Sequence, residues 1–149
     1  HILYHLKNTG EKTISTDEYN HNFMAINNEM VGVNYRLKFP FTMKPELIEG
    51  NVNPEGKVNV GTNNFTFNGT PEKQFFFGNL SGGQTVDATW ELINTSTGIG
   101  IRETGSFKTN KINLWGWKQV ISPELFFSIR VEPGKEIEWS RTYSIFETK

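Results

Sequence analysis

Hydrophobic and polar residues alternate with a period of two in several stretches of the chain. In residues 34–41, NYRLKFPF, the aromatic and leucine side chains fall on one face and the two basic side chains on the other. Residues 84–94 and 125–146 alternate in the same way. Because successive side chains of a β-strand point to opposite sides, this pattern predicts half-buried strands.

Turn-forming residues separate these stretches. Asn8 and Gly10 interrupt the first stretch, TSTGIG occupies residues 95–100, and EPGK occupies residues 132–135. We therefore expect hairpins at 95–100 and 132–135, one short helical turn at 45–48, and an irregular aromatic segment at 112–120. Together these elements predict an all-β fold, an antiparallel β-sandwich of residues 1–149 in one domain.

Composition and charge remove several classes of function. With 15 basic and 16 acidic side chains the formal net charge is −1, so we expect neither a nucleic acid nor a membrane as partner. No apolar run is long enough to span a bilayer, and no leader sequence precedes the first strand-like residues. We therefore expect the chain to be a portion of a longer protein.

Metal and thiol chemistry are not indicated by the sequence. The chain contains no cysteine, and its three histidines do not cluster with carboxylates, so we expect no metal site and no cofactor. The missing cysteines fit both a reducing and an oxidising compartment, which leaves the localisation open. No phosphate-binding glycine loop or nucleophile elbow occurs.

The segment YNHNF contains the first candidate for chemistry. His21 lies between Asn20 and Asn22, with Tyr19 and Phe23 outside them. Histidine is the usual proton donor or acceptor at neutral pH, and the neighbouring amide and aromatic side chains could form a polar pocket around a sugar. The alternative is a histidine at a strand end that bonds only to backbone.

Glu124 and two tryptophans are the other candidates. Glu124 follows Pro123 and precedes a strongly apolar run, a place where desolvation raises a carboxyl pKa and suits acid–base work. Otherwise it is an exposed glutamate at the start of a strand. Trp115 and Trp117 flank a glycine in NLWGW and could stack on a sugar ring; the alternative is core packing.

Three blocks of the chain, in order, resemble the galactose mutarotase-like (aldose 1-epimerase-like) superfamily, in particular its C-terminal half. The first runs from Leu6, Asn8 and Gly10 into the Asn-His-x-Phe motif at residues 20–23. The second is the expected hairpin LINTSTGIGIRETG, and the third begins at Glu124 and continues through VEPGKE to a last aromatic strand. The resemblance implies half of a large antiparallel supersandwich.

The resemblance also implies an activity. Active members interconvert sugar anomers, with a histidine that protonates the ring oxygen and a glutamate that removes the anomeric hydroxyl proton. His21 and Glu124 occupy those places, 103 residues apart. Asn20, Asn22, Phe23, Trp115 and Trp117 are then expected to contact the sugar or glycan.

The chain also departs from the family. Full-length members have an N-terminal half that supplies a second histidine and an arginine, and no aspartate occurs in residues 72–75, EKQF, where the family has one. Two functions therefore stay open, an epimerase-like enzyme and a carbohydrate-binding or structural sandwich without turnover. Exposed sheet edges lead us to expect a homo-oligomer or a partner equivalent to the absent N-terminal half.

Overall fold

The computed structural model describes residues 1–148, which form thirteen β-strands and one 3-10 turn. The strands are β1 (Ile2–Lys7), β2 (Ile14–Glu18), β3 (Tyr35–Lys38), β4 (Glu49–Val52), β5 (Val58–Val60), β6 (Asn64–Phe67), β7 (Phe75–Gly78), β8 (Val86–Asn94), β9 (Ile99–Thr109), β10 (Ile112–Trp117), β11 (Val120–Leu125), β12 (Phe127–Val131) and β13 (Glu136–Glu147). The 3-10 turn covers Pro45–Leu47, inside the stretch predicted to be helical.

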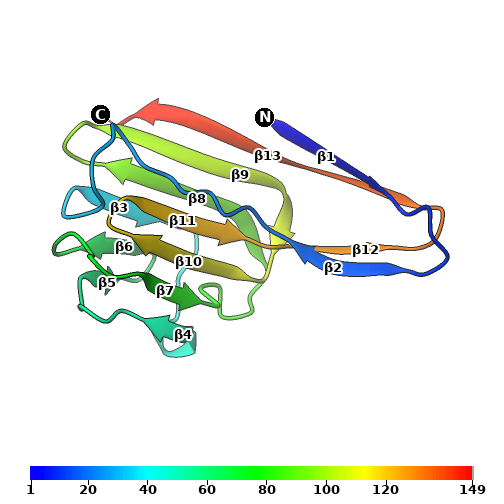
Figure 1. The fold of residues 1–149 in the computed structure, drawn as a ribbon, viewed down its shortest axis with the longest axis horizontal. Helices are drawn as coiled ribbons and strands as arrows, with labels where there is room; N and C mark the ends of the chain where they lie inside the picture. Colours follow the sequence, from blue (N-terminus) through cyan, green and yellow to red (C-terminus); the bar gives the residue numbers. More distant parts are fainter. Residues whose placement is uncertain (149) are drawn as a thin grey trace.

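The strands form three sheets in which all pairs are antiparallel. The large sheet has the order β1-β13-β9-β8-β3-β6-β5, the small sheet β11-β10-β7-β4, and a separate ribbon pairs β12 with β2. The large and small sheets pack face to face in the body of the molecule, and an elongated arm extends from it (Figure 1). The predicted all-β sandwich class is confirmed.

The core of the body lies between the large and small sheets. Inward residues of β7 and β10 (Phe75, Phe77 and Leu114) meet those of β3 and β8 (Leu37 and Trp90), and all five are nearly inaccessible to solvent. Alternation along each strand sends one side chain in two into this layer. The predicted inward face of residues 34–41 is correct for Tyr35, Leu37 and Phe39, which are buried.

The arm is a second, smaller sandwich. The first half of β13 pairs with β1, its second half pairs with β9 in the body, and the ribbon of β2 and β12 closes the arm. Ile129, Val131 and Trp139 form a core of their own, against which Tyr4 stacks with its ring centroid 5.1 Å from that of Trp139. β13 therefore links the arm rigidly to the body.

Asn8 holds the tip of the arm together. It is 2% exposed, its side chain donates to the carbonyls of Lys12 and Val131, and its backbone bonds to Gly134 and Lys135. The side-chain amide of Asn8, in the sequence block with Leu6 and Gly10, therefore has a structural role at the tip of the arm. The predicted turn at 132–135 forms, but it is no hairpin, because β12 pairs with β2 whereas β13 pairs with β1 and β9.

Two other local predictions are wrong. The segment 112–120 is not irregular, because residues Ile112–Trp117 form β10, which pairs with β11 on one side and β7 on the other. Glu124 is not at a strand start but near the end of β11. The glycine of NLWGW permits this regular strand, since a β-carbon on Gly116 would lie 2.2 Å from the Phe75 ring.

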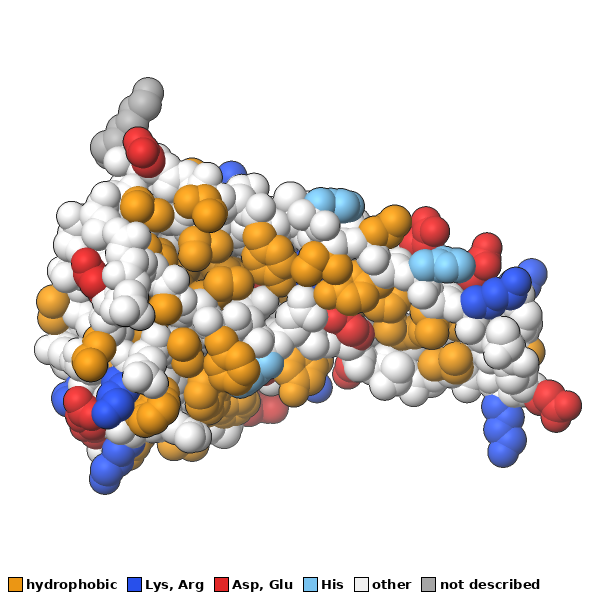
Figure 2. Space-filling model, turned by 45° about the horizontal axis from the view of Figure 1, so that its top comes forward, with side chains coloured by type: hydrophobic (Ala, Val, Ile, Leu, Met, Phe, Trp, Pro, Cys, Tyr) orange, Lys and Arg blue, Asp and Glu red, His pale blue; other side chains and the backbone are white. Residues whose placement is uncertain are grey.

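Apolar side chains remain exposed on one face of the molecule. Figure 2 shows them running from the body onto the arm. The exposed large hydrophobic residues include Ile2, Tyr19, Phe23 and Ile145, the last of which is 80% exposed. The expectation of a homo-oligomer or an absent half stays a prediction.

Candidate functional site

The site forms where the segment after β2 crosses the edge of the small sheet. Met24 and Ile121 exchange two backbone hydrogen bonds of 2.7 and 2.9 Å, which fastens this segment alongside β11. Phe23, just before the bridge, has a left-handed backbone with φ of 47°. This conformation is uncommon for a bulky residue and is found preferentially at functional positions.

His21 and Glu124 are in direct contact. The Nδ1 atom of His21 makes a short hydrogen bond or ion pair with Oε1 of Glu124, and it lies 3.2 Å from the hydroxyl of Ser122. The Glu124 side chain is 7% exposed, whereas that of His21 is 35% exposed. The histidine therefore covers the carboxylate while remaining open to solvent.

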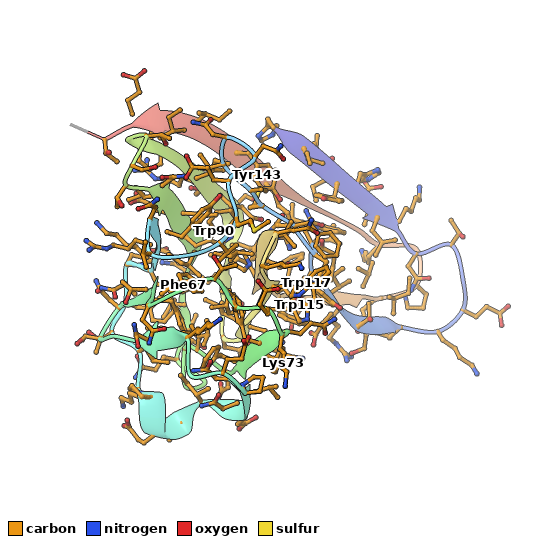
Figure 3. The ribbon with its side chains drawn as sticks, turned by 60° about the vertical axis from the view of Figure 1, so that its left-hand side comes forward. Phe67, Lys73, Trp90, Trp115, Trp117 and Tyr143 are labelled. Carbon is orange, nitrogen blue, oxygen red and sulfur yellow. The ribbon has the colours of Figure 1, made fainter. Side chains whose placement is uncertain are left out.

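Aromatic rings surround this pair. Phe23 meets the imidazole edge-on with centroids 4.3 Å apart, and Trp115 lies 5.0 Å from the imidazole and 5.6 Å from Phe23. Trp115 and Trp117 come from the same face of β10 (Figure 3), and the indole of Trp117 donates to the carbonyl of Glu72. Trp115 is thus at the His21–Glu124 pair, and Trp117 is one row further along the strand.

Asn20 and Asn22 point to the interior instead. The Asn22 side chain donates to Glu103 and to the carbonyl of Pro123, and it accepts a 2.8 Å bond from Tyr143. Its backbone N–H donates to Ser122. Asn20 bonds to the hydroxyl groups of Tyr4 and Tyr143. These amides anchor both sides of His21 to the sandwich, and the Asn22 side chain is fully bonded within the chain.

Glu103 and Arg141 form a buried polar centre beneath this segment. Both are inaccessible to solvent, and Nη1 of Arg141 lies 2.7 Å from Glu103. Glu103 also accepts 2.7 and 2.9 Å bonds from Trp90 and Asn22. A buried carboxylate is tolerated only when paired and hydrogen-bonded in this way.

Arg141 joins all three sheets. From β13 in the large sheet it reaches Glu18 at the end of β2 and the carbonyl of Leu125 at the end of β11. Glu18 accepts a further bond from Trp139. Because β2 leads into His21 and β11 carries Glu124, Arg141 fixes the two chain segments from which the pair is built.

The electrostatics of this centre favour one protonation state. Burial lowers the pKa of Arg141, but hydrogen bonds to Glu18 and Glu103 outweigh burial and raise it above its ordinary value. Burial raises the pKa of Tyr143 to about 12, and the charge of Glu103 adds to the increase. Tyr143 therefore stays a neutral donor to Asn22 well beyond neutral pH.

The Glu103–Arg141 centre was not predicted from the sequence. Arg141 and Tyr143 were visible as alternating inward positions of the last strand, and a charged residue at such a position is the one available signal. Glu103 lies in the stretch IGIRETG, where nothing distinguishes it from its exposed neighbours. Its partners come from β8, β13 and the segment after β2, so only the fold identifies it.

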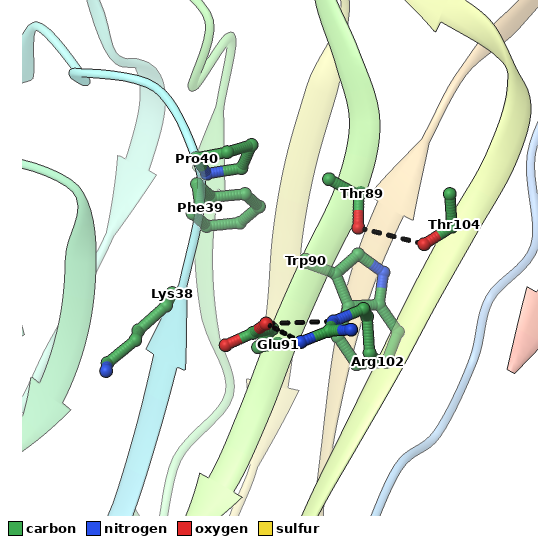
Figure 4. A pocket seen from close by; sticks show the side chains of 8 residues that line it. All are labelled: Lys38, Phe39, Pro40, Thr89, Trp90, Glu91, Arg102 and Thr104. Carbon is green, nitrogen blue, oxygen red and sulfur yellow. Dashed lines mark hydrogen bonds and ion pairs between the residues drawn. The ribbon is translucent and has the colours of Figure 1, made fainter. Parts of the chain in front are cut away.

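No group of three or more histidine, cysteine, aspartate or glutamate residues within 1–148 is arranged to hold a metal ion. None of the helical segments in that range is long and apolar enough to cross a membrane. A separate cavity of about 360 Å³ lies on the large sheet, beside Lys38, Pro40 and the Glu91–Arg102 ion pair (Figure 4).

Comparison with known proteins supports the fold. No family model and no curated protein matches the chain. Among solved structures, a "putative aldose 1-epimerase" from Klebsiella pneumoniae superposes with a TM-score of 0.65 at 12% identity over 98% of this chain and 42% of its own. The Slr1438 protein from Synechocystis gives 0.60 at 13% identity over 99% of this chain and 50% of its own.

A more distant match is a TPR-domain containing protein from Parabacteroides distasonis, with a TM-score of 0.53, 9% identity, and 94% and 27% of the two chains covered. This chain thus spans half or less of the length of these three structures. At such identities the likeness concerns the fold alone. It agrees with the mutarotase-like architecture that the sequence blocks resemble.

Proposed function

We propose that the chain carries an acid–base site for an aldose, in which His21 and Glu124 interconvert the two anomers of the sugar. The main support for the proposal is the contact between these two side chains, which lie 103 residues apart in the sequence. The aromatic rings of Phe23 and Trp115 lie beside the imidazole of this pair. The structural likeness to a "putative aldose 1-epimerase" is a second, weaker support.

The chemistry needs a proton donor and a proton acceptor of opposite charge. A protonated His21 would give its proton to the ring oxygen while ionised Glu124 takes the proton of the anomeric hydroxyl. The bond between the anomeric carbon and the ring oxygen breaks, the open aldehyde rotates, and both transfers reverse on the opposite face. Nothing is consumed, and both side chains return to their starting protonation states.

The resting contact fits this requirement in one respect. Nδ1 of His21 already contacts Oε1 of Glu124, so the donor and the acceptor of the proposed reaction lie side by side before a sugar binds. The sugar would separate the two side chains on binding. Solvent access to His21 and the aromatic rings of Phe23 and Trp115 leave a surface on which a sugar ring can stack.

Anomeric exchange of glucose and galactose, measured by saturation-transfer NMR, tests the proposal. We expect the wild-type chain to accelerate exchange, and His21→Ala or Glu124→Gln to reduce the acceleration at least 100-fold, the lower end of what general acid–base groups contribute. The matched control is His5→Ala. His5 contacts Glu136 at 3.3 Å in an exposed pair on the arm, and its loss should leave exchange unchanged.

Three outcomes of this exchange experiment would contradict the proposed function. Exchange at the buffer rate would exclude the enzymatic function for this chain, and binding of sugar without exchange would make it a carbohydrate-binding domain. Equal losses in His5→Ala and His21→Ala would show that general destabilisation, and not acid–base chemistry, caused the effect.

A further inference from the structure

The outer face of the small sheet continues from Glu124 toward β4 as two parallel rows of side chains. Directly opposed residues of antiparallel strands share a face, so the strand register defines these rows. One row is polar and contains Glu124, its partner Asn113, and Glu49 beyond. The other is largely aromatic and contains Ser122, Trp115 and Phe76.

Gly78 interrupts the polar row with a position that has no side chain and that its neighbours enclose closely. A β-carbon placed there would lie 2.9 Å from the carbonyl oxygen of Glu49, 3.3 Å from the Phe76 ring and 3.6 Å from Oδ1 of Asn113. Gly50, opposite the same ring, likewise contributes no side chain. Because neither glycine has a side chain, the Phe76 ring lies close against both of them, between the polar groups, and stays partly exposed.

The Phe76 ring and these two glycines border a groove of about 600 Å³. The groove is lined by Glu49, Gly50, Phe76, Gly78, Asn79, Asn110, Lys111 and Asn113. Its size lies within the range of about 300–1,000 Å³ that is usual for ligand pockets. An apolar ring on the floor with amide and carboxylate groups around it suits a sugar ring, which has apolar faces and a polar rim.

We propose that this groove is a second sugar subsite, so that the ligand class of the chain is an oligosaccharide. Its reducing end would lie at His21 and Glu124, and the next residue would stack on Phe76 with hydroxyl groups facing Asn113 and Glu49. The inference rests on the proposed function for the position of the reducing end. The strand register indicates the direction in which the oligosaccharide would run from Glu124, because Asn113 borders the groove and is also the register partner of Glu124.

Phe76→Ala tests the subsite with little risk to the fold. Phe76 belongs to neither hydrophobic core, and its ring lies on the outer face. The matched control is Phe146→Ala, which removes a partly buried phenylalanine from the outer face of the large sheet, where the ring contacts Arg102. Two readouts are needed, namely anomeric exchange and ligand-observed saturation-transfer binding, each with glucose, maltose, cellobiose and the corresponding tetrasaccharides.

For the wild-type chain, we expect kcat/KM at least tenfold higher for a di- or tetrasaccharide than for glucose. Phe76→Ala should remove about tenfold of this preference while glucose exchange changes less than twofold, and Phe146→Ala should change neither. A preference that is absent, or that survives in Phe76→Ala, overturns the subsite.

The two proposals fail separately. If no sugar shows exchange but tetrasaccharides bind to the wild-type chain and not to Phe76→Ala, the proposed function is wrong and the subsite stands. If glucose exchanges and longer sugars gain nothing in rate or binding, the subsite is wrong and the proposed function stands. If no sugar binds or exchanges, both are wrong.

Discussion

Two glutamates in this molecule occupy opposite situations, although both lie within the network around the segment after β2. Glu103 is sealed between the sheets and has three donors, one of them a guanidinium. Glu124 is also buried, but its ring partner, the imidazole of His21, is open to solvent, and within residues 1–148 no lysine or arginine pairs with it. The fully satisfied carboxylate is suited to holding strands in place, and the one with fewer partners is the one for which we propose acid–base chemistry.

The largest expected effect follows from removing the cation of the interior centre. Arg141→Met leaves Glu103 and Glu18 without their partner, and breaking a buried pair in this way costs about 3–5 kcal/mol in the free energy of unfolding. Urea denaturation followed by tryptophan fluorescence measures the loss. Arg130→Met is the control, since its pair with Glu132 is exposed and should contribute less than about 1 kcal/mol.

Asn22→Ala probes the connection between the two glutamates. It removes donors to Glu103 and Pro123 and the acceptor of Tyr143, so we expect a loss of about 1–3 kcal/mol in unfolding free energy. Because Asn22 adjoins His21, anomeric exchange should fall with it, and the NMR signals of the His21 ring should broaden or shift. Unchanged His21 signals would show that Asn22 does not position the histidine.

Tyr143→Phe tests the buried Glu103–Arg141 centre through the pH dependence of the free energy of unfolding. Burial raises the pKa of Tyr143 to about 12, above the unfolded value near 10. Its contribution to stability is therefore complete below pH 10 and disappears as the pH rises through 12. Between these values the wild-type chain should lose about 1–2 kcal/mol more than the phenylalanine variant, after allowance for partial exposure. Parallel stability curves for the two proteins would contradict this.

The smallest effect on stability is expected at the His21–Glu124 pair. His21→Gln removes a partly exposed imidazole from a buried carboxylate, and the glutamine can still donate to Glu124, so the free energy of unfolding should fall by only about 1 kcal/mol even as anomeric exchange is lost. Thermal unfolding compared with exchange rates provides the check. If His21→Gln lowered the free energy of unfolding as much as Arg141→Met does, the His21–Glu124 pair would be a structural element like the Glu103–Arg141 pair, and the contrast between the two glutamates would not hold.

The sequence predicted the features that depend on local pattern. Alternation located the strands at residues 34–41 and 84–94, and the resemblance to the mutarotase-like blocks singled out both His21 and Glu124, which the fold brings into contact. Strand pairing was not predictable, because β12 and β13 follow one another but join different sheets. The Glu103–Arg141 centre was missed for a related reason, since its members are distributed over four segments that only tertiary packing brings together.

The position of Arg141 has a consequence for how the site comes into existence during synthesis. His21 emerges from the ribosome early and Glu124 late, yet the residue that fixes both of their segments is later still. A chain that lacked β13 would contain His21 and Glu124 without the arginine that fixes both of their segments. Contacts between such distant positions form slowly, because a long loop must close first. The contact between His21 and Glu124 should therefore become stable only once β13 has paired and Arg141 has reached both segments.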